Sequence, residues 1–525
     1  MAPTVRTTPG VYVTELDAFP RSIPGVATAV PAFIGYTQKS VLNGKQVGFQ
    51  PMLINSLADY EAIFGQGYLP IYNIDEVTTP NPEDYDFSQD GKYYVLKPTS
   101  DTQYNLYNSL RMFYANGGGS AYVVSVGSYA DQISKDNLEQ GLNVIADQSG
   151  PTMLLVPDAL LLAAPDTTKP LECPAFYELG KSMLAQSKKL GDRVAILDVY
   201  AGNTLKQMRT GFQTELDGRM DSFREQIGNE NLNYGMVYFP FLNSTIIQPS
   251  EISYTNLNVK DAAQLKVLQD LLNAQAATMY PPDSAALATV KGYIGDIGTP
   301  AYDDDPVARN RLNQNLSSAV PLLGQLELLI AQKNNVLPPS GTMAGIFSRN
   351  DSTRGVWNAP ANMDVNSVIG PTVNINNDQQ SSMNVPLDGK AVNAIRSFVG
   401  RGTLVWGART LDGNSNDWRY IQVRRTLIYI EQSIKTALNS FVFAANDGQT
   451  WVAVTSMISN FLQGLWSQGG LMGDKATDAF SVACGLGSTM TPQDILEGYM
   501  VVQITLQMIH PAEFIELTFK QKMGS

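Results

Sequence analysis

The pattern of apolar and polar positions predicts a long amphipathic helix near the C-terminal end of the chain. Residues 418–443 read WRYIQVRRTLIYIEQSIKTALNSFVF, and their apolar side chains recur at spacings of three, four or six. Such spacing places these side chains on one stripe of a helix. Asp417 can cap the start, because a short acidic side chain accepts the free amide protons of the first turn. The stripe consists of Ile421, Leu427, Ile430, Ile434, Leu438 and Phe441.

A second helix and two strands are predicted to follow. The turn NDG at 446–448 ends the first helix, since Asn and Gly tolerate left-handed backbone, and residues 451–468 form the next helical run. Residues 499–508 are rich in apolar residues and read as a strand. Residues 514–520 alternate between two faces, as a strand does. A strand at the end of a chain must pair with another strand or fray.

The first 20 residues read as an arm that carries one short strand. The turn TTPG precedes this strand, and Pro20 follows it. Six residues cannot form a stable strand alone, so the strand must join a larger sheet. From the residues by themselves, an edge strand of its own domain and a strand added to another molecule are both open. The strand consists of Val11, Tyr12, Val13, Thr14, Glu15 and Leu16.

Between residues 122 and 243 apolar runs alternate with helical stretches, which predicts an α/β fold with a partly parallel sheet. Asp158 comes just after one predicted strand and Asp198 lies at the end of another, where α/β enzymes keep catalytic groups. No histidine, glycine fingerprint or base accompanies them, so we interpret them as turn and cap residues. The predicted strands are 122–126, 153–156, 193–199 and 236–242, and the predicted helices are 135–147, 175–189 and 205–213.

Surface insertions are predicted near residues 68–99 and 244–305, which are rich in Pro, Asp and Tyr or in loop signals. Helices are predicted at 104–114, 261–277 and 309–333, and the acidic run 303–305 is interpreted as a solvated loop before a helix. Residues 393–398 read as a short helix, followed by a strand that contains Trp406.

The charge is acidic and unevenly distributed. The 525 residues carry a formal net charge of −13, which argues against a nucleic-acid surface. Residues 346–525 hold 13 Lys/Arg and 14 Asp/Glu, whereas residues 1–345 hold 23 and 35. A nearly neutral part can pack against copies of itself, while an acidic part keeps a large particle soluble. The alternative is that this uneven distribution of charge arose by chance.

The chemical inventory predicts no catalytic, cofactor-binding or metal-binding residues. The two cysteines, Cys173 and Cys484, form no metal or disulfide pattern, and no signal peptide is evident, so we expect synthesis in the cytoplasm. The longest apolar stretch, 153–164, is too short to span a bilayer. The one histidine, His510, lies beside Pro511 and is interpreted as a structural or pH-tuned interface residue. We therefore expect a protein that is not an enzyme.

Several motifs resemble contractile tail sheath proteins, which occur in phage tails, bacteriocins and phage-tail-like injection systems. Two motifs resemble the N-terminal region of these proteins: TPGVYVTEL at 8–16 and PGVATAVPAFIGYT at 24–37. The run TRGVWNAPAN at 353–362 and the C-terminal motifs SFVFAANDGQTW at 440–451, NFLQGLWSQGGL at 460–471 and PAEFIELTFKQ at 511–521 resemble later parts. Several motifs in the right order are more specific than any one alone.

The resemblance implies a structural subunit that polymerises around an inner tube and contracts from a metastable extended state. Residues 1–20 and 346–525 would form the sheath core, and residues 21–345 would form outer α/β domains. The terminal strands would be exchanged between subunits. At the C-terminal end these exchanged residues would be Ile515, Glu516, Leu517, Thr518 and Phe519, and at the N-terminal end Val11 to Leu16.

The resemblance also implies partners. The expected partners are other copies of the chain, an inner tube protein, and baseplate and terminal cap proteins, with no direct contact to nucleic acid or membrane. Arg424 and Arg425 on the long helix are candidates for contacting the tube or a neighbouring subunit; pairing within the chain, for example with Glu431, is the alternative. The particle would be a phage tail or a contractile injection system, and an extracellular location after release stays open.

The residues alone leave two other classes of protein possible. A static shell or capsid-like protein would also be acidic and poor in motifs, but would need neither terminal arms nor a tube partner. A nucleotide-dependent α/β enzyme would need a phosphate-binding loop. The glycine run 117–119 precedes a predicted strand instead of following one, which disfavours that use.

Overall fold

The computed structural model describes residues 22–78, 84–100, 103–207 and 211–516. The chain divides into two compact units. The terminal unit comprises residues 1–27 and 425–525, and the sheet unit comprises residues 28–424. The boundary falls inside helix α13 (Ile421–Leu438), whereas the sequence placed the start of a C-terminal domain at residue 346. The grouping into an inner core and outer domains of an assembly stays a prediction.

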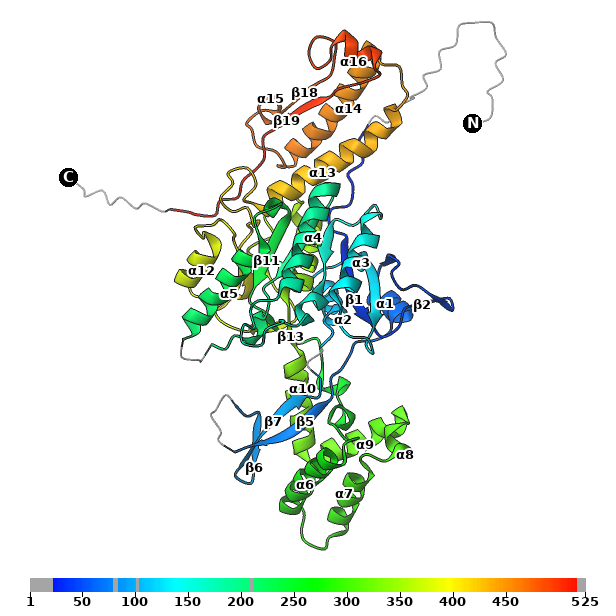
Figure 1. Ribbon diagram of the computed structural model, residues 1–525, viewed down its shortest axis with the longest axis vertical. Coiled ribbons are helices and arrows are strands. Elements are labelled where there is room, and N and C mark those ends of the chain that lie inside the picture. Colours follow the sequence, from blue (N-terminus) through cyan, green and yellow to red (C-terminus); the bar gives the residue numbers. More distant parts are fainter. Residues whose placement is uncertain (1–21, 79–83, 101–102, 208–210, 517–525) are drawn as a thin grey trace, which may run out of the picture. The chain divides into compact units, whose positions relative to one another are not determined.

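The sheet unit is built on a nine-stranded sheet with the order β14-β17-β16-β11-β10-β9-β1-β8-β4 (Figure 1). Neighbouring strands are parallel from β8 through β1, β9, β10 and β11 to β16, and antiparallel at both edges. The α/β prediction with a partly parallel sheet is thus confirmed. The strands are β1 (Pro31–Thr37), β4 (Met52–Ile54), β8 (Ala121–Ser128), β9 (Met153–Leu155), β10 (Val194–Asp198), β11 (Gly235–Phe239), β14 (Met363–Asp364), β16 (Asn393–Phe398) and β17 (Gly402–Val405).

Helices cover both faces of this sheet. Phe33 of β1 contacts Phe113 of α2 (Leu106–Ala115), with ring centroids 5.6 Å apart. The next residue, Ile34, lies against Gly141 of α3 (Lys135–Ala146). Successive side chains of a strand point to opposite faces, so α2 and α3 lie on opposite sides. Helix α11 (Pro339–Arg354) packs with α2, helix α4 (Pro174–Leu190) packs beside α3, and α5 (Phe212–Ile227) packs beside α4.

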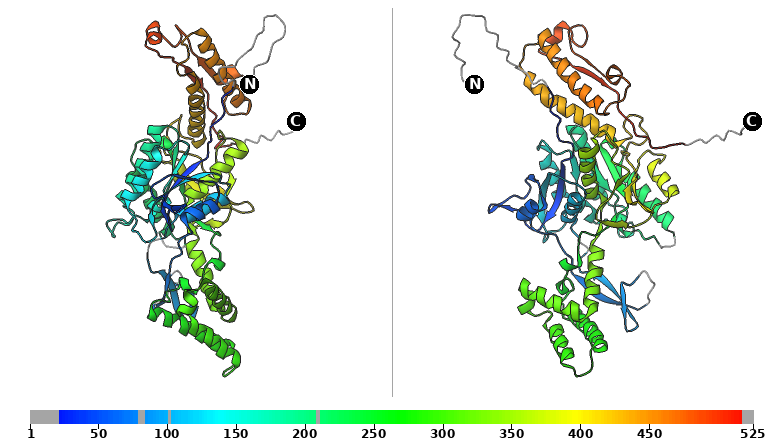
Figure 2. Two further views of the ribbon diagram at one scale, coloured as in Figure 1. Left: turned by 90° about the vertical axis from the view of Figure 1, so that its right-hand side faces the viewer. Right: turned by 180° about the vertical axis from the view of Figure 1, so that it is seen from behind.

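The two expected surface insertions share one hydrophobic core. The sheet β5 (Tyr72–Val77), β7 (Lys92–Pro98) and β6 (Phe87–Gln89) packs against helices from the later insertion, as all views in Figures 1 and 2 show. The Ile74 amide donates to Gln264 Oε1 at 2.7 Å, which joins the two segments. The helices are α6 (Ala262–Met279), α7 (Ala285–Asp296), α8 (Pro300–Asp303), α9 (Pro306–Ala319) and α10 (Pro321–Asn334).

Three predictions of secondary structure are wrong. Helix 309–333 is two helices, α9 and α10, because Pro321 lacks the amide proton that a continuous helix needs. No helix covers 205–213 within the described residues; α5 begins at Phe212. Residues 393–398 form strand β16, because its backbone pairs with β11 and β17, and Trp406 follows β17 rather than lying in it.

The remaining elements of the sheet unit connect these layers. They are β2 (Val41–Leu42), β3 (Lys45–Gln46), α1 (Leu57–Phe64), β12 (Leu242–Ser244), β13 (Val336–Leu337), β15 (Val368–Pro371) and α12 (Asn377–Asn384). Short 3-10 turns lie at η1 (Pro157–Leu161), η2 (Gly202–Thr204), η3 (Leu232–Tyr234), η4 (Pro249–Glu251) and η5 (Tyr254–Asn256).

The terminal unit contains most of α13, the helix α14 (Gly448–Ser467) and a two-stranded antiparallel sheet. Both predicted helices are confirmed, each within a few residues of its predicted bounds. The strand predicted at 499–508 is shorter, β19 (Gln503–Leu506). Of the strand predicted at 514–520, only residues 514–516 are described, and they form no strand. The other elements are η6 (Asn439–Phe441), α15 (Ala476–Ala479), β18 (Phe480–Ala483) and α16 (Pro492–Leu496).

Candidate assembly surface

The two carboxylates at the strand ends of the sheet unit cap helices that are remote in the sequence. Asp158 Oδ1 accepts from the backbone amides of Asn105 at 2.6 Å and Leu106 at 3.1 Å, at the start of α2, while Oδ2 accepts from the Tyr36 amide at 2.7 Å. Asp198 Oδ1 accepts from the Ser340 amide at 2.9 Å, in the first turn of α11. The interpretation as cap residues is confirmed.

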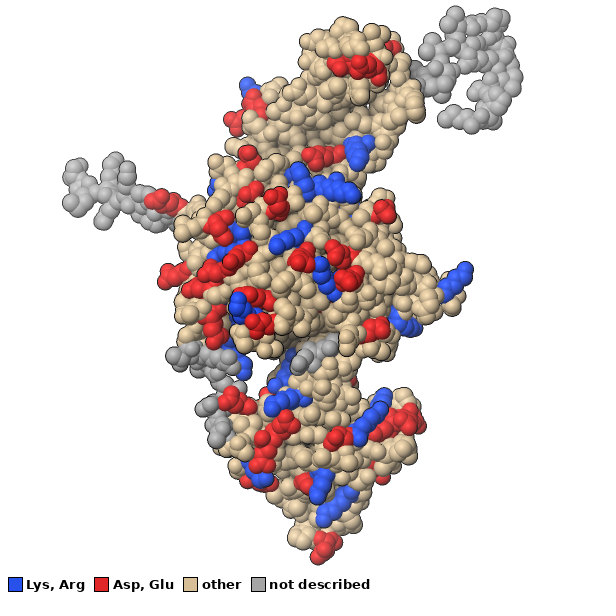
Figure 3. All heavy atoms as spheres, viewed as in Figure 1, with Lys and Arg blue, Asp and Glu red and all other residues tan. Residues whose placement is uncertain are grey.

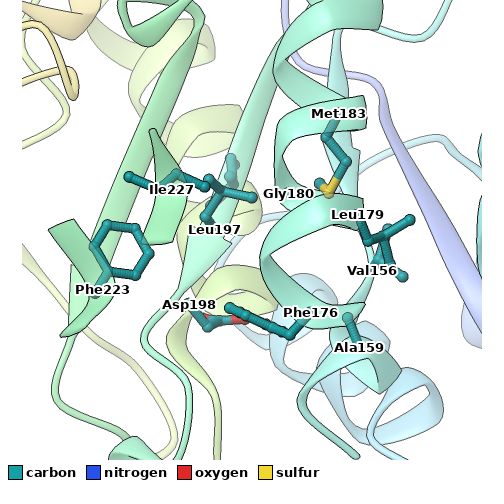
Figure 4. Close-up of a pocket in the computed structure, with 11 residues that line it drawn as sticks. Val156, Ala159, Phe176, Leu179, Gly180, Met183, Leu197, Asp198, Phe223 and Ile227 are labelled. Atoms are coloured by element: carbon teal, nitrogen blue, oxygen red, sulfur yellow. The ribbon is translucent and has the colours of Figure 1, made fainter. Parts of the chain in front are cut away.

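Burial raises the pKa of Asp158 to about 6 and that of Asp198 to about 7, although the hydrogen bonds from backbone amides act in the opposite direction. Asp198 borders a cavity of about 20 Å³ between α4, α5 and β10 (Figure 4). This volume holds about one water molecule. Its other walls are apolar side chains such as Phe176, Met183 and Phe223. The cavity is too small for a substrate, so it gives Asp198 no catalytic setting.

The N-terminal segment of the described chain lies along α13 within the terminal unit. The Val26 amide donates to Ser433 Oγ at 3.1 Å. Gly25 lies so close to Tyr429 that a Cβ there would be 2.2 Å from the phenol oxygen. A larger residue at position 25 would therefore require the Tyr429 ring to move. The first described residues and α13 therefore meet in one compact unit.

The sheet of the terminal unit has open edges. Strands β18 and β19 pair antiparallel, with Phe480 opposite Leu506 and Ala483 opposite Gln503, and in the described chain each has only the other as its sheet partner. Helix α14 packs against β18. A two-stranded ribbon is only marginally stable in water, and unpaired edges accept further strands. Within the described residues, this sheet therefore has room for a further strand on either side, and whether one is added stays a prediction.

The surface of the terminal unit is poor in charge. Helix α14 contains no charged residue over its 20 positions, and the surface over it is uncharged in Figure 3. Interface cores are depleted of charged residues, and contiguous exposed apolar side chains mark interaction sites. The large apolar residues exposed in this unit include Val442, Phe443, Val452, Met472, Leu486, Leu496, Tyr499, Val501, Phe514 and Ile515.

The basic pair on α13 is buried in this conformation. Arg424 is 5% exposed and Arg425 4%. The guanidinium carbon of Arg424 lies 4.5 Å from the ring centroid of Trp418 and 4.6 Å from that of Tyr234, so it is held by two aromatic rings of the sheet unit. A contact of Arg424 or Arg425 with a tube or a neighbouring subunit stays a prediction, and it would require these side chains to become exposed.

Most residues predicted to exchange between subunits are not described. Val11, Tyr12, Val13, Thr14, Glu15 and Leu16, and likewise Leu517, Thr518 and Phe519, lie outside the described residues. Ile515 and Glu516 are described; both are exposed and belong to no strand. Strand exchange stays a prediction.

The described residues contain no group of three or more His, Cys, Asp or Glu side chains that could hold a metal ion. His510 is exposed. Among these same residues no helix is long and apolar enough to cross a bilayer. What the structure does bring together is a uniform set of assembly features: a terminal unit with open strand edges, a helix without charge and many exposed apolar side chains. These features are typical of proteins that assemble through contacts between copies or with other proteins.

Comparison with known proteins agrees with this class. Residues 414–522 match the phage tail sheath C-terminal domain family. The tail sheath protein of Vibrio phage KVP40 is 23% identical over 188 residues, 36% of this chain and 27% of that protein. The tail sheath protein of Burkholderia phage BcepMu is 28% identical over 144 residues, 26% of this chain and 30% of that protein. The chain thus spans less than a third of either relative.

Solved structures resemble the chain over nearly its whole length. The sheath complex of the PVC extracellular contractile injection system, in its contracted state, is 25% identical with a TM-score of 0.56, covering 99% of both chains. The contracted helical sheath of the anti-feeding prophage is 25% identical with a TM-score of 0.57, covering 99% of this chain and 100% of that one. The predicted resemblance to contractile tail sheath proteins is therefore confirmed, and with it the fold class.

Proposed function

We propose that this chain is a structural subunit of a contractile sheath and has no catalytic role. The observation that carries the proposal is the likeness to contracted sheath subunits over 99% of the chain, from the sheet unit through to the terminal unit. Tail sheath proteins from two phages support the same role. Copies would join head to tail, a heterologous contact that does not close and so generates tubes of open length.

The terminal unit supports strand exchange as the joint between copies. The open edges of β18 and β19 offer unpaired backbone groups to a strand from a neighbouring molecule. In strand addition the backbone hydrogen bonds provide affinity, and alternating side chains set the register. The segments that would be added are Val11 to Leu16 and Ile515 to Phe519. Such joints would keep neighbours connected while the rest of each subunit moves.

Contraction needs two packings of one sequence whose free energies differ by a modest amount per copy. The extended sheath would be metastable, and firing would let the subunits re-pack with larger buried interfaces. Many identical copies contribute together, so no nucleotide is required. An inner tube protein, a baseplate and a terminal cap would be the other partners. A structure of the anti-feeding prophage baseplate contains a chain that is 25% identical to this one, which supports the baseplate contact.

Deletion of either end tests the proposal. The full chain is expressed with its tube partner and viewed by negative-stain electron microscopy, beside variants that lack residues 1–16 or 512–525. We expect wide-bore tubes from the full chain and soluble folded monomers from both deletions. Tubes from either deletion would show that exchanged strands are not essential. Discrete closed particles from the full chain would support a static shell in place of a sheath.

A further inference from the structure

A hairpin next to the edge strand β14 of the nine-stranded sheet carries a cluster of arginine and aromatic side chains. Strands β16 and β17 pair from Ile395 opposite Val405 to Phe398 opposite Gly402. The rings of Phe398 and Trp406 lie 4.6 Å apart between centroids. The guanidinium of Arg396 lies 5.3 Å from the Phe398 ring, and that of Arg401 lies 6.0 Å from the Trp406 ring.

This cluster is accompanied by an apolar side chain in full contact with solvent. Val399, in the turn of the hairpin, is 106% exposed. An exposed valine beside fixed aromatic rings contributes nothing to the core of this chain. The hairpin patch, as we name this surface, consists of Arg396, Phe398, Val399, Arg401 and Trp406.

The two arginines are held in place without a carboxylate partner. Arg396 Nη1 donates to Asn377 Oδ1 at 3.0 Å and to Gln380 Oε1 at 2.7 Å, and Arg401 Nη2 donates to Asn362 Oδ1 at 2.7 Å. In the part of the chain that the structure describes, neither arginine forms an ion pair. A guanidinium has five N–H donors, so both retain donors, and amide acceptors leave their positive charge uncompensated.

Such a surface has the composition of a protein-binding hot spot. Trp and Arg are enriched at the residues that dominate binding energy. Stacking on a ring fixes a guanidinium before a partner arrives, which reduces the entropy lost on binding. The remaining donors can meet a carboxylate in a bidentate pair, which is among the strongest hydrogen-bonded contacts. The preferred partner is therefore an acidic protein surface with an apolar recess for Val399.

Another copy of this chain supplies that chemistry. The net charge of the chain is −13, so most of its surface repels another copy, and a basic patch is where attraction can arise. Exposed carboxylates gather over α4 and α5, interspersed with basic side chains in Figure 3. A groove there is lined by the apolar residues Pro170 and Leu171, by the acidic residues Glu172, Glu178, Asp221 and Glu225, and by Lys169 and Lys181, so carboxylates outnumber lysines by four to two.

We propose that the hairpin patch binds an acidic surface on a second copy of the chain, as a contact separate from the terminal strands. This inference rests on the proposed self-assembly and adds to it a second joint between copies, formed by the sheet unit. Two joints per pair of copies would fix the orientation of neighbours, which one exchanged strand by itself does not.

Photo-crosslinking identifies the occupant directly. Benzoylphenylalanine is placed at position 399 of the full chain, and the assembled polymer is irradiated. We expect a covalent dimer of this chain, with the crosslinked peptide in the acidic sheet unit of the second copy. If polymers form and the crosslink joins a different protein, or none, the inference is overturned while the proposed function stands. If the full chain forms no polymer, both fail.

Substitutions measure the contribution of the patch. We expect Val399→Asp, and separately Arg396→Gln with Arg401→Gln, to raise the critical concentration for polymerisation about tenfold or more, as loss of a hot spot does. Val307→Asp is the matched control, because Val307 on α9 is also exposed, at 77%, and belongs to no such stack. Position 399 is fully exposed, so the fold tolerates the change. Equal critical concentrations for Val399→Asp and Val307→Asp would overturn the inference.

Discussion

Gly341 of α11 lies directly against Ser109 of α2. A Cβ at position 341 would be 2.4 Å from the Ser109 carbonyl oxygen, and a Cβ at Gly345, one turn later, would be 2.4 Å from the Phe113 carbonyl oxygen. Two glycines four residues apart thus let the two helices touch backbone to backbone. These are the helices that Asp158 and Asp198 cap, so one helix pair is held at its starts by buried carboxylates and along its length by close packing.

We expect Gly341→Ala to reduce the free energy of unfolding by about 1–3 kcal/mol, because the added methyl group pushes the helices apart. The helical preference of alanine offsets about 0.5–1 kcal/mol of this at most. Urea unfolding of the unassembled chain measures it. Gly324→Ala is the control, since Gly324 also lies in a helix, α10, with no atom within 4 Å of its Cβ position. Equal effects of the two substitutions would contradict the packing argument.

The buried carboxyls predict a dependence of stability on pH. The folded pKa values, about 6 for Asp158 and about 7 for Asp198, exceed the value of about 3.9 in an unfolded chain. The folded state therefore binds more protons between these values. The stability that these groups contribute is present below pH of about 4 and is lost as pH rises towards about 7.

We expect Asp158→Asn and Asp198→Asn each to flatten the fall in unfolding free energy between about pH 4 and 7, because asparagine does not titrate. Urea unfolding at several pH values measures the slope. Asp304→Asn, at an exposed position, should leave the slope unchanged. If Asp158→Asn or Asp198→Asn gave the same slope of unfolding free energy against pH as the natural chain, the replaced carboxyl would titrate in the folded protein as an exposed carboxyl does.

The stack of Arg424 between Trp418 and Tyr234 predicts that no other cation replaces this arginine well. A lysine lacks the planar group that lies flat on two rings. We expect Arg424→Lys to cost about 0.5–2 kcal/mol of unfolding free energy, the range of a buried cation–π contact. Thermal unfolding of the full chain provides the measurement, with Lys435→Gln, at an exposed position of the same helix, as control. An unchanged melting temperature for Arg424→Lys would argue against the stack as an anchor of α13.

Local patterns predicted much of the fold. Buried parallel strands are continuous apolar runs, so β9 and β10 were found within a residue or two. The amphipathic stripe identified α13, and family motifs indicated the class of protein before any coordinates. These features depend on neighbours in the sequence, which is why the sequence by itself determined them. The helix predicted over residues 393–398 failed because pairing with β11, more than 150 residues away, overrides local preference.

Tertiary structure alone decided what distant segments do together. Ile74 and Gln264 showed no sign of a shared core, and the backbone amides that Asp158 and Asp198 cap belong to helices far along the chain. Arg401 and Trp406 carry no recognisable motif, and only the turn of the hairpin sets them together. The spacing of apolar residues along a chain indicates which face of a helix or strand each residue occupies. Which elements meet depends on the summed packing of many weak contacts, and no single stretch of sequence contains that sum.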